Sequence, residues 1–188
     1  VRRLAALEDH RAPDRQREPG EGQPDPGEHR DPLEAQRRDD VAGPFEVFSV
    51  VGRRHDLNPF HVSLVAERAS PVVLRNGFRV QPHFTIHNAP PAQVLIVPGG
   101  LGTRTELNNE RLIDWVRRSA GIAELVLSVC TGALLLGRAG LLDGLDVTTH
   151  HGAYDLLREV APMARLRAGE RFLDNGRILV AAGVSAGI

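Results

Sequence analysis

A single cysteine stands where a run of apolar residues gives way to a helical pattern. Residues 125–133 read LVLSVCTGA, so Cys130 follows an apparent buried strand and precedes a helix. Ser128 and Gly132, two positions to either side, are small enough for strand and helix to approach closely, as in a nucleophile elbow. Unpaired N–H groups at the helix start favour a thiolate, so we expect the thiol pKa of Cys130 to be lowered. The alternative is a structural cysteine in the core, the commonest fate of a lone cysteine.

A glycine-rich loop offers backbone donors to the same site. Residues 94–97 are wholly apolar, as in a parallel strand buried on both faces, and lead into PGGLG at 98–102. Ligands bind at the carboxyl ends of strands in open α/β sheets. We therefore expect the N–H groups of Gly100 and Thr131 to stabilise an oxyanion. A tight turn or a phosphate loop is the alternative, although the spacing of a dinucleotide fingerprint and the lysine of a P-loop are missing.

Two polar side chains need a role. Asp40 precedes an apolar helical pattern and could cap that helix, with Asp39 as a competing cap. His150 ends a short strand after Cys130 and could hydrogen-bond a thiolate or relay protons, or be an ordinary loop residue. No metal-ligand spacing is found among His55, His61, His83 and His87, so we expect no bound metal.

Strands must alternate with helices to bring these residues together. Periodicity predicts helices over 41–51, with Pro44 in the first turn, and over 109–120, 131–137 and 154–160. It predicts strands over 61–67, 94–97, 124–129 and 146–149. Asn76-Gly77 indicates a hairpin between 72–74 and 79–81, and residues 174–176 indicate a turn between 171–172 and 178–181. The alternation predicts an α/β domain with a mainly parallel sheet.

Composition divides the chain near residue 40. Residues 1–39 are rich in charged residues, Gln, Pro and Gly, so we expect disorder there, with at most a short helix over 2–9. The 188 residues suit one domain, and a net charge of −1 argues against a nucleic-acid or membrane-surface protein. No apolar run approaches the length of a membrane span. The single cysteine forms no internal disulfide, so a reducing, cytoplasmic location is expected.

The motifs together resemble the ThiJ/PfpI superfamily. They are the PGGLG loop, SVCTGA at 128–133, TTH at 148–150, AGVSAGI at 182–188 and DVAGPFEVF at 40–48, which looks like the first helix of the family. The resemblance covers residues 40–188 and implies a class I glutamine-amidotransferase-like fold, a flavodoxin-like three-layer α/β sandwich. Thr131 after the cysteine, Asp40 before the first helix and residues 183–188 are similar to the isonitrile-hydratase-like branch.

The resemblance implies roles for three side chains. Cys130 would be the nucleophile, Asp40 an acid/base partner near its sulfur, and Thr131 a supporting donor. The implied reaction hydrates a small isonitrile to an N-substituted formamide in a homodimer, without a metal or an organic cofactor. Three alternatives stay open. They are a ligand-sensing domain like those of AraC-type regulators, a stress-type thiol protein that handles aldehydes or senses oxidants, and an inactive fragment.

The sequence departs from the family pattern at both ends. Members begin with a buried strand that leads into the aspartate-containing turn, but residues 34–39 cannot form such a strand. Members also continue into a final helix beyond the position of Ile188. We therefore expect residues 1–39 to be a wrong-frame or mis-annotated start. We also expect the C-terminal helix to be missing and the sheet to be incomplete at both ends.

Overall fold

A seven-stranded sheet forms the centre of the molecule in the computed structural model, which describes residues 2–7, 39–52, 57, 59–74 and 77–183. Neighbouring strands are parallel, except that the edge strand β10 is antiparallel to β11. The expected mainly parallel sheet is therefore confirmed. The order across the sheet is β10 (Phe172–Asp174), β11 (Ile178–Ala181), β7 (Leu125–Val129), β6 (Val94–Val97), β1 (Arg2–Leu7), β2 (Phe60–Ala66) and β5 (Phe84–Thr85).

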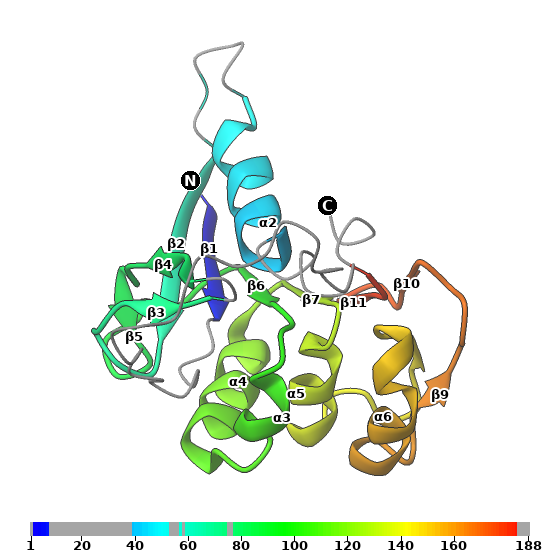
Figure 1. The fold of residues 1–188 in the computed structure, drawn as a ribbon. Helices are drawn as coiled ribbons and strands as arrows, with labels where there is room; N and C mark the ends of the chain where they lie inside the picture. Colours follow the sequence, from blue (N-terminus) through cyan, green and yellow to red (C-terminus); the bar gives the residue numbers. More distant parts are fainter. Residues whose placement is uncertain (1, 8–38, 53–56, 58, 75–76, 184–188) are drawn as a thin grey trace, which may run out of the picture.

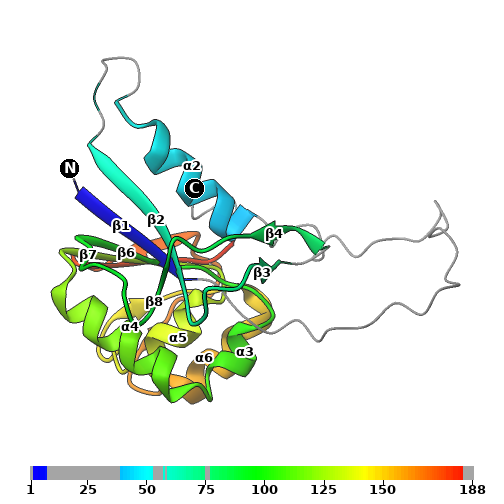
Figure 2. The same ribbon diagram turned by 90° about the vertical axis from the view of Figure 1, so that its left-hand side faces the viewer.

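Helices cover both faces of this sheet and complete a three-layer sandwich (Figures 1 and 2). One face carries α2 (Asp39–Val50). The other face carries α3 (Thr103–Glu106), α4 (Glu110–Ile122), α5 (Gly132–Arg138) and α6 (Tyr154–Val160). The largest group of buried apolar side chains joins the second face to α4, α5 and α6. The expected flavodoxin-like architecture is thus confirmed.

The amphipathic helix α4 shows how the sequence builds this layer. The side chain of Asn109 accepts a hydrogen bond from the Leu112 N–H and caps the helix. Its apolar residues recur at helical spacing, so one face is buried against the sheet. These buried residues are Leu112, Ile113, Trp115, Val116 and Ala120.

Two small sheets lie beside the main one. The antiparallel pair β3 (Val72–Val73) and β4 (Arg79–Val80) confirms the predicted hairpin, and Gly77 in its turn has a φ of 76°. The predicted turn at 174–176 is confirmed by the antiparallel pairing of β10 with β11. The parallel pair β8 (Asp146–Val147) and β9 (Arg165–Leu166) was predicted only in its first strand.

The N-terminal residues correct one prediction. We expected residues 1–39 to be disordered, with at most a helix over 2–9, and the sheet to lack its first buried strand. Residues 2–7 instead form β1, which pairs in parallel with β6 on one side and β2 on the other. Strand formation here depends on pairing with residues far along the chain and outweighs the local composition. Such long-range pairing cannot be predicted from a short stretch of sequence. Residues 8–38 lie outside the described part.

The first helix also differs from its prediction. It begins at Asp39, so Asp40 lies within the helix and does not precede it as a cap. Pro44 is consequently inside the helix and not in its first turn, and its ring nitrogen has no hydrogen to donate to the Asp40 carbonyl. The early start places the Asp40 side chain in the interior, where it is 0% exposed.

Some predictions fall on residues that the structure does not describe. These are residue 55, residue 76 of the hairpin turn and residues 184–188 of the closing AGVSAGI motif. The short elements α3 and β5, like β9, were not predicted. None of the helices described is long and apolar enough to cross a membrane.

Candidate functional site

The turn at Cys130 is strained in the way that an elbow requires. Cys130 follows β7 directly, and α5 starts two residues later with Thr131 at its N-cap. The φ of Cys130 is 55°, and among the described residues no other non-glycine residue has a positive φ. Such a conformation costs on the order of 1–3 kcal/mol and persists only where the surroundings hold it. The thiol-bearing residue is 6% exposed, so it lies near the surface but not on it.

Hydrogen bonds hold the Cys130 backbone on both sides. Its N–H donates to the carbonyl of Ala181 in β11 at 3.0 Å. Its own carbonyl accepts from the Thr149 hydroxyl at 2.7 Å, and Thr149 is 0% exposed. Buried hydrogen bonds of this kind stabilise by about 1 kcal/mol each, which is comparable with the cost of the strained φ.

Gly132 allows the elbow to pack against the neighbouring strand. A Cβ atom at this position would lie 2.0 Å from the carbonyl oxygen of Val97 and 3.0 Å from that of Pro98. No side chain fits there, so the start of α5 rests directly on the end of β6. The close approach expected from the small residue at 132 is therefore present. The hydroxyl of Ser128, the other small residue, is buried and has no hydrogen-bond partner among the described residues.

Gly99 marks the point where the site residues meet. A Cβ atom there would lie 2.6 Å from the Thr131 nitrogen, 2.8 Å from Oδ2 of Asp40 and 2.8 Å from Cβ of Cys130. The Asp40 carboxyl group, the cysteine and the first N–H of the elbow therefore surround a single glycine. The structure thus brings together three of the residues that the sequence singled out, Asp40 from α2 and Cys130 and Thr131 from the turn between β7 and α5.

The glycine loop is bound to the elbow by a pair of hydrogen bonds, which corrects another expectation. The N–H of Gly100 donates to Oγ1 of Thr131 at 2.8 Å, and the same hydroxyl donates to the Gly100 carbonyl at 3.0 Å. We expected the Gly100 N–H to stabilise an oxyanion, but here it is committed to Thr131. The Thr131 hydroxyl can accept one hydrogen bond and donate another. Sequence spacing could not show that it binds the glycine loop.

His150 has a defined ring nitrogen. Its Nδ1 accepts the N–H of Gly152 at 3.2 Å, so in the neutral ring the proton lies on Nε2. The rings of His150 and His151 lie 4.2 Å apart between centroids. His150 follows Thr149 directly, which places it beside the residue that holds the Cys130 carbonyl.

Thr149 is the site residue that sequence reasoning missed. It belongs to the TTH motif, but only the structure shows that its hydroxyl reaches the elbow. Within the described ranges, no group of three or more His, Cys, Asp or Glu side chains is arranged to hold a metal ion.

Comparison with known proteins gives a consistent family assignment. The sequence pattern of the DJ-1/PfpI family matches residues 37–187. Isonitrile hydratase from Pseudomonas putida is 34% identical over 149 residues, covering 79% of this chain and 61% of that protein. The HTH-type transcriptional regulator GbdR of Pseudomonas aeruginosa is 28% identical over 110 residues, covering 58% of this chain and 30% of the regulator.

The fold comparison agrees. A THiJ/PfpI family protein from Pseudomonas syringae superposes with a TM-score of 0.72 at 22% identity, covering 99% of this chain and 64% of that one. The chain therefore spans less than two thirds of the length of each of these three proteins.

Proposed function

The chain belongs to the DJ-1/PfpI family, and from that premise we propose that it is a cysteine-dependent enzyme that hydrates isonitriles to N-substituted formamides. The observation that carries the proposal is the meeting of Cys130, Asp40 and the Thr131 nitrogen around Gly99. The similarity to an isonitrile hydratase supports the choice of reaction. A reducing, cytoplasmic location would keep Cys130 as a thiol.

In the first step, the Cys130 thiolate attacks the terminal carbon of the isonitrile. A carbon–sulfur bond forms, and the negative charge that develops on that carbon is quenched by a proton from Asp40, which gives a thioimidate. Asp40 is fully buried, and burial favours the neutral form of a carboxyl group, which is the form that carries a proton to give.

In the second step, water adds to the thioimidate carbon. The Asp40 carboxylate takes a proton from the water and passes it to the nitrogen. The adduct then collapses: its hydroxyl proton returns to Asp40, the carbon–sulfur bond breaks, and the formamide leaves with the thiolate regenerated. The Thr131 N–H stabilises the oxygen as charge builds on it, and the Nε2–H of His150 serves as an auxiliary donor.

The glycine loop takes a supporting role in this account. Because the Gly100 N–H and carbonyl both bind the Thr131 hydroxyl, Gly100 fixes the loop beside the elbow. The oxyanion site then depends on the Thr131 backbone and not on the Gly100 N–H. No metal or organic cofactor is required for either step.

Formamide release from an alkyl isonitrile tests the proposed reaction. The native chain should produce the N-alkyl formamide, and Cys130→Ala and Asp40→Asn should each reduce the rate by at least about 10³-fold, as losses of nucleophiles and acid/base groups do. Ser128→Ala serves as a control because it changes a buried residue of β7, the strand that precedes Cys130, and has no part in the proposed chemistry. Equal turnover in the native protein and Cys130→Ala would contradict the proposal.

A ligand-sensing role is the second candidate, and the similarity to HTH-type regulators supports it. In that case the site would bind a small molecule without consuming it. Isonitriles or other small ligands would raise the melting temperature of native protein and Cys130→Ala alike, with no formamide formed. Turnover by the native chain would rule against pure sensing.

The resemblance that implies the reaction also implies a homodimer. Sedimentation equilibrium of the purified chain should give twice the monomer mass at assay concentrations. A monomer mass throughout the concentration range would contradict the dimer without affecting the proposed chemistry.

A further inference from the structure

We propose that Thr149 is a positioning residue that fixes the peptide group between Cys130 and Thr131 and so aims the Thr131 N–H into the site. The inference rests on the proposed function, because that N–H is the proposed oxyanion donor. It starts from the 2.7 Å hydrogen bond that the Thr149 hydroxyl donates to the Cys130 carbonyl in the interior.

Peptide geometry carries the first step. A trans peptide is planar, and its C=O and N–H point in opposite directions. Holding the Cys130 oxygen on the Thr149 side therefore turns the Thr131 N–H to the other side. Gly99 lies close to that nitrogen, since a Cβ on Gly99 would be 2.6 Å from it, and Asp40 lies at the same point. One hydrogen bond thus sets the direction of a donor across the elbow.

Strain explains why the peptide needs this anchor. Cys130 has a φ of 55°, which is unfavourable for a residue with a side chain. Two hydrogen bonds hold the Cys130 backbone against this relaxation, from its N–H to the Ala181 carbonyl and from the Thr149 hydroxyl to its own carbonyl. Without the second, the Cys130 backbone can relax and the following peptide can rotate. The bond also polarises the amide, which strengthens its N–H as a donor.

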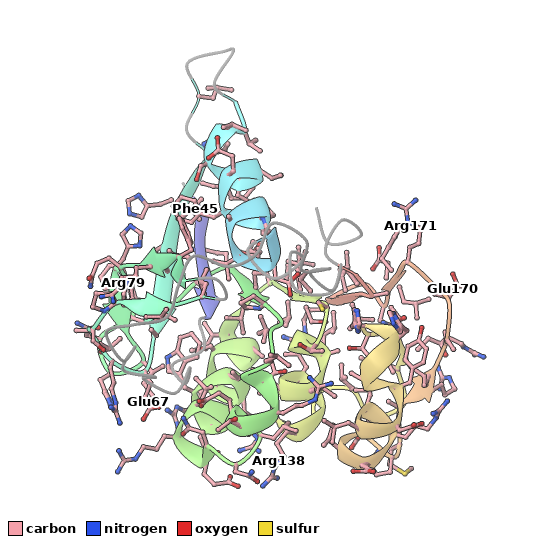
Figure 3. All side chains as sticks on the ribbon, in the orientation of Figure 1. Phe45, Glu67, Arg79, Arg138, Glu170 and Arg171 are labelled. Atoms are coloured by element: carbon pink, nitrogen blue, oxygen red, sulfur yellow. The ribbon has the colours of Figure 1, made fainter. Side chains whose placement is uncertain are left out.

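The neighbouring threonine provides a matched control. Thr148 is likewise 0% exposed, and its hydroxyl also donates to a backbone carbonyl, that of Glu170 at 3.1 Å. Glu170 lies on the segment between β9 and β10, at the rim of the molecule and away from α5 (Figure 3). Thr→Val at either position keeps shape and removes one buried hydroxyl, so the two variants should lose similar stability.

The test compares Thr149→Val, Thr149→Ser and Thr148→Val by the pH dependence of Cys130 alkylation. The chain has one cysteine, so the signal belongs to a single site. We expect the thiol pKa in Thr149→Val to move toward the free value of about 8.5. Thr149→Ser keeps the hydroxyl, so its thiol pKa should equal that of the native protein. Thr148→Val should lower the urea midpoint of unfolding by a similar amount and leave the thiol pKa unchanged.

Two results would overturn the positioning role. One is an unchanged thiol titration in Thr149→Val, and the other is an equal change in Thr148→Val. If Thr149→Val does not fold, Thr149→Ala is compared with Thr148→Ala in the same way.

Turnover separates this inference from the proposed reaction. Where isonitrile hydration is measured, Thr149→Val should lower kcat by roughly 10–100-fold, less than the 10²–10³-fold typical of deleting an oxyanion donor, with KM little changed. If the native chain shows no hydration but the alkylation pattern holds, the proposed reaction fails and the positioning role stands.

Discussion

Cys130 carries two demands that conflict at one position. The backbone conformation favours glycine, because a φ of 55° is unfavourable for residues with a Cβ, whereas the proposed reaction requires a thiol at this position. The strain is met by bonds from β11 and from Thr149. The strained turn at Cys130 therefore lowers the stability of the fold but places the cysteine beyond the end of the strand.

This conflict predicts a stability difference between two variants that both lack the thiol. Cys130→Gly should be more stable than Cys130→Ala by about 1 kcal/mol, because glycine adopts a positive φ without strain while alanine keeps the cost. Urea unfolding of both proteins measures it. Equal midpoints, or a more stable alanine variant, would show that the turn carries no strain.

Single residues were read from sequence with uneven success. Cys130 and Gly132 were identified correctly as parts of an elbow, because the strand, the turn and the helix are contiguous in the chain. The carbonyl bond from Thr149 and the capture of Gly100 by Thr131 were not predicted. Both join residues far apart in sequence, and spacing carries no information about which hydroxyl reaches which backbone group.

The contact between β6 and α5 is the element-level feature on which the site depends. Gly132→Ala should destabilise the fold by about 3 kcal/mol or more, because the new Cβ would lie 2.0 Å from the Val97 oxygen, and backbone cannot move aside easily. Gly121→Ala in α4 is the matched control. Nothing lies within 4 Å of its Cβ position, so it should stabilise by about 0.5–1 kcal/mol.

Chemical denaturation of the two glycine variants distinguishes the cases. Opposite shifts of the midpoint are expected. A stable Gly132→Ala protein with normal thiol reactivity would mean that β6 and α5 are not in contact as described.

The β8–β9 pair has a pH-dependent connection. Asp146 accepts hydrogen bonds from Arg165 and Arg167, and the bond from Arg165 is the main reason that the pKa of Asp146 lies below its ordinary value of 3.8. A lowered pKa in the folded state means stabilisation that is present above pH 3.8 and lost as the pH falls below it.

Asp146→Asn should therefore be less stable than the native protein near neutral pH, and the difference should shrink as the pH falls below 3.8. The effect should be small, since these side chains are partly exposed. Urea midpoints across the acid range measure it. A difference that stays constant with pH would assign the loss to something other than the charge of Asp146.

Elements were predicted best where the pattern is local and strong. The strand at 94–97 and the helix at 154–160 have the predicted bounds, and the two turns lie where their glycines indicated. The start of α2 was placed late, because Pro44 was taken as a first-turn residue and the preceding aspartates as caps. Two-residue strands such as β5 leave too little periodicity to be recognised.

At the scale of the whole molecule, β1 is the element that joins the two halves of the sheet. It lies between β6 and β2, and the glycine loop of the candidate site begins where β6 ends. Sequence alone assigned this segment to disorder, because the residues after it are charged and its pairing partners lie about sixty to ninety positions away.

The central place of β1 predicts the effect of breaking its backbone pairing. Ala5→Pro should destabilise the domain by at least about 2 kcal/mol, because Ala5 stands between Ser63 of β2 and Leu95 of β6, and proline has no N–H to donate. The urea midpoint and the thiol reactivity of Cys130 should fall together. An unchanged urea midpoint would contradict the placement of β1 within the sheet.

The most direct test of the account is the rate of Cys130 alkylation as a function of pH, in native protein and in concentrated guanidinium. An assembled elbow predicts a native thiol pKa below the free value of about 8.5, returning to that value on denaturation. Coincident curves in the two states would contradict the account, because they would show that the fold does nothing to activate its single cysteine.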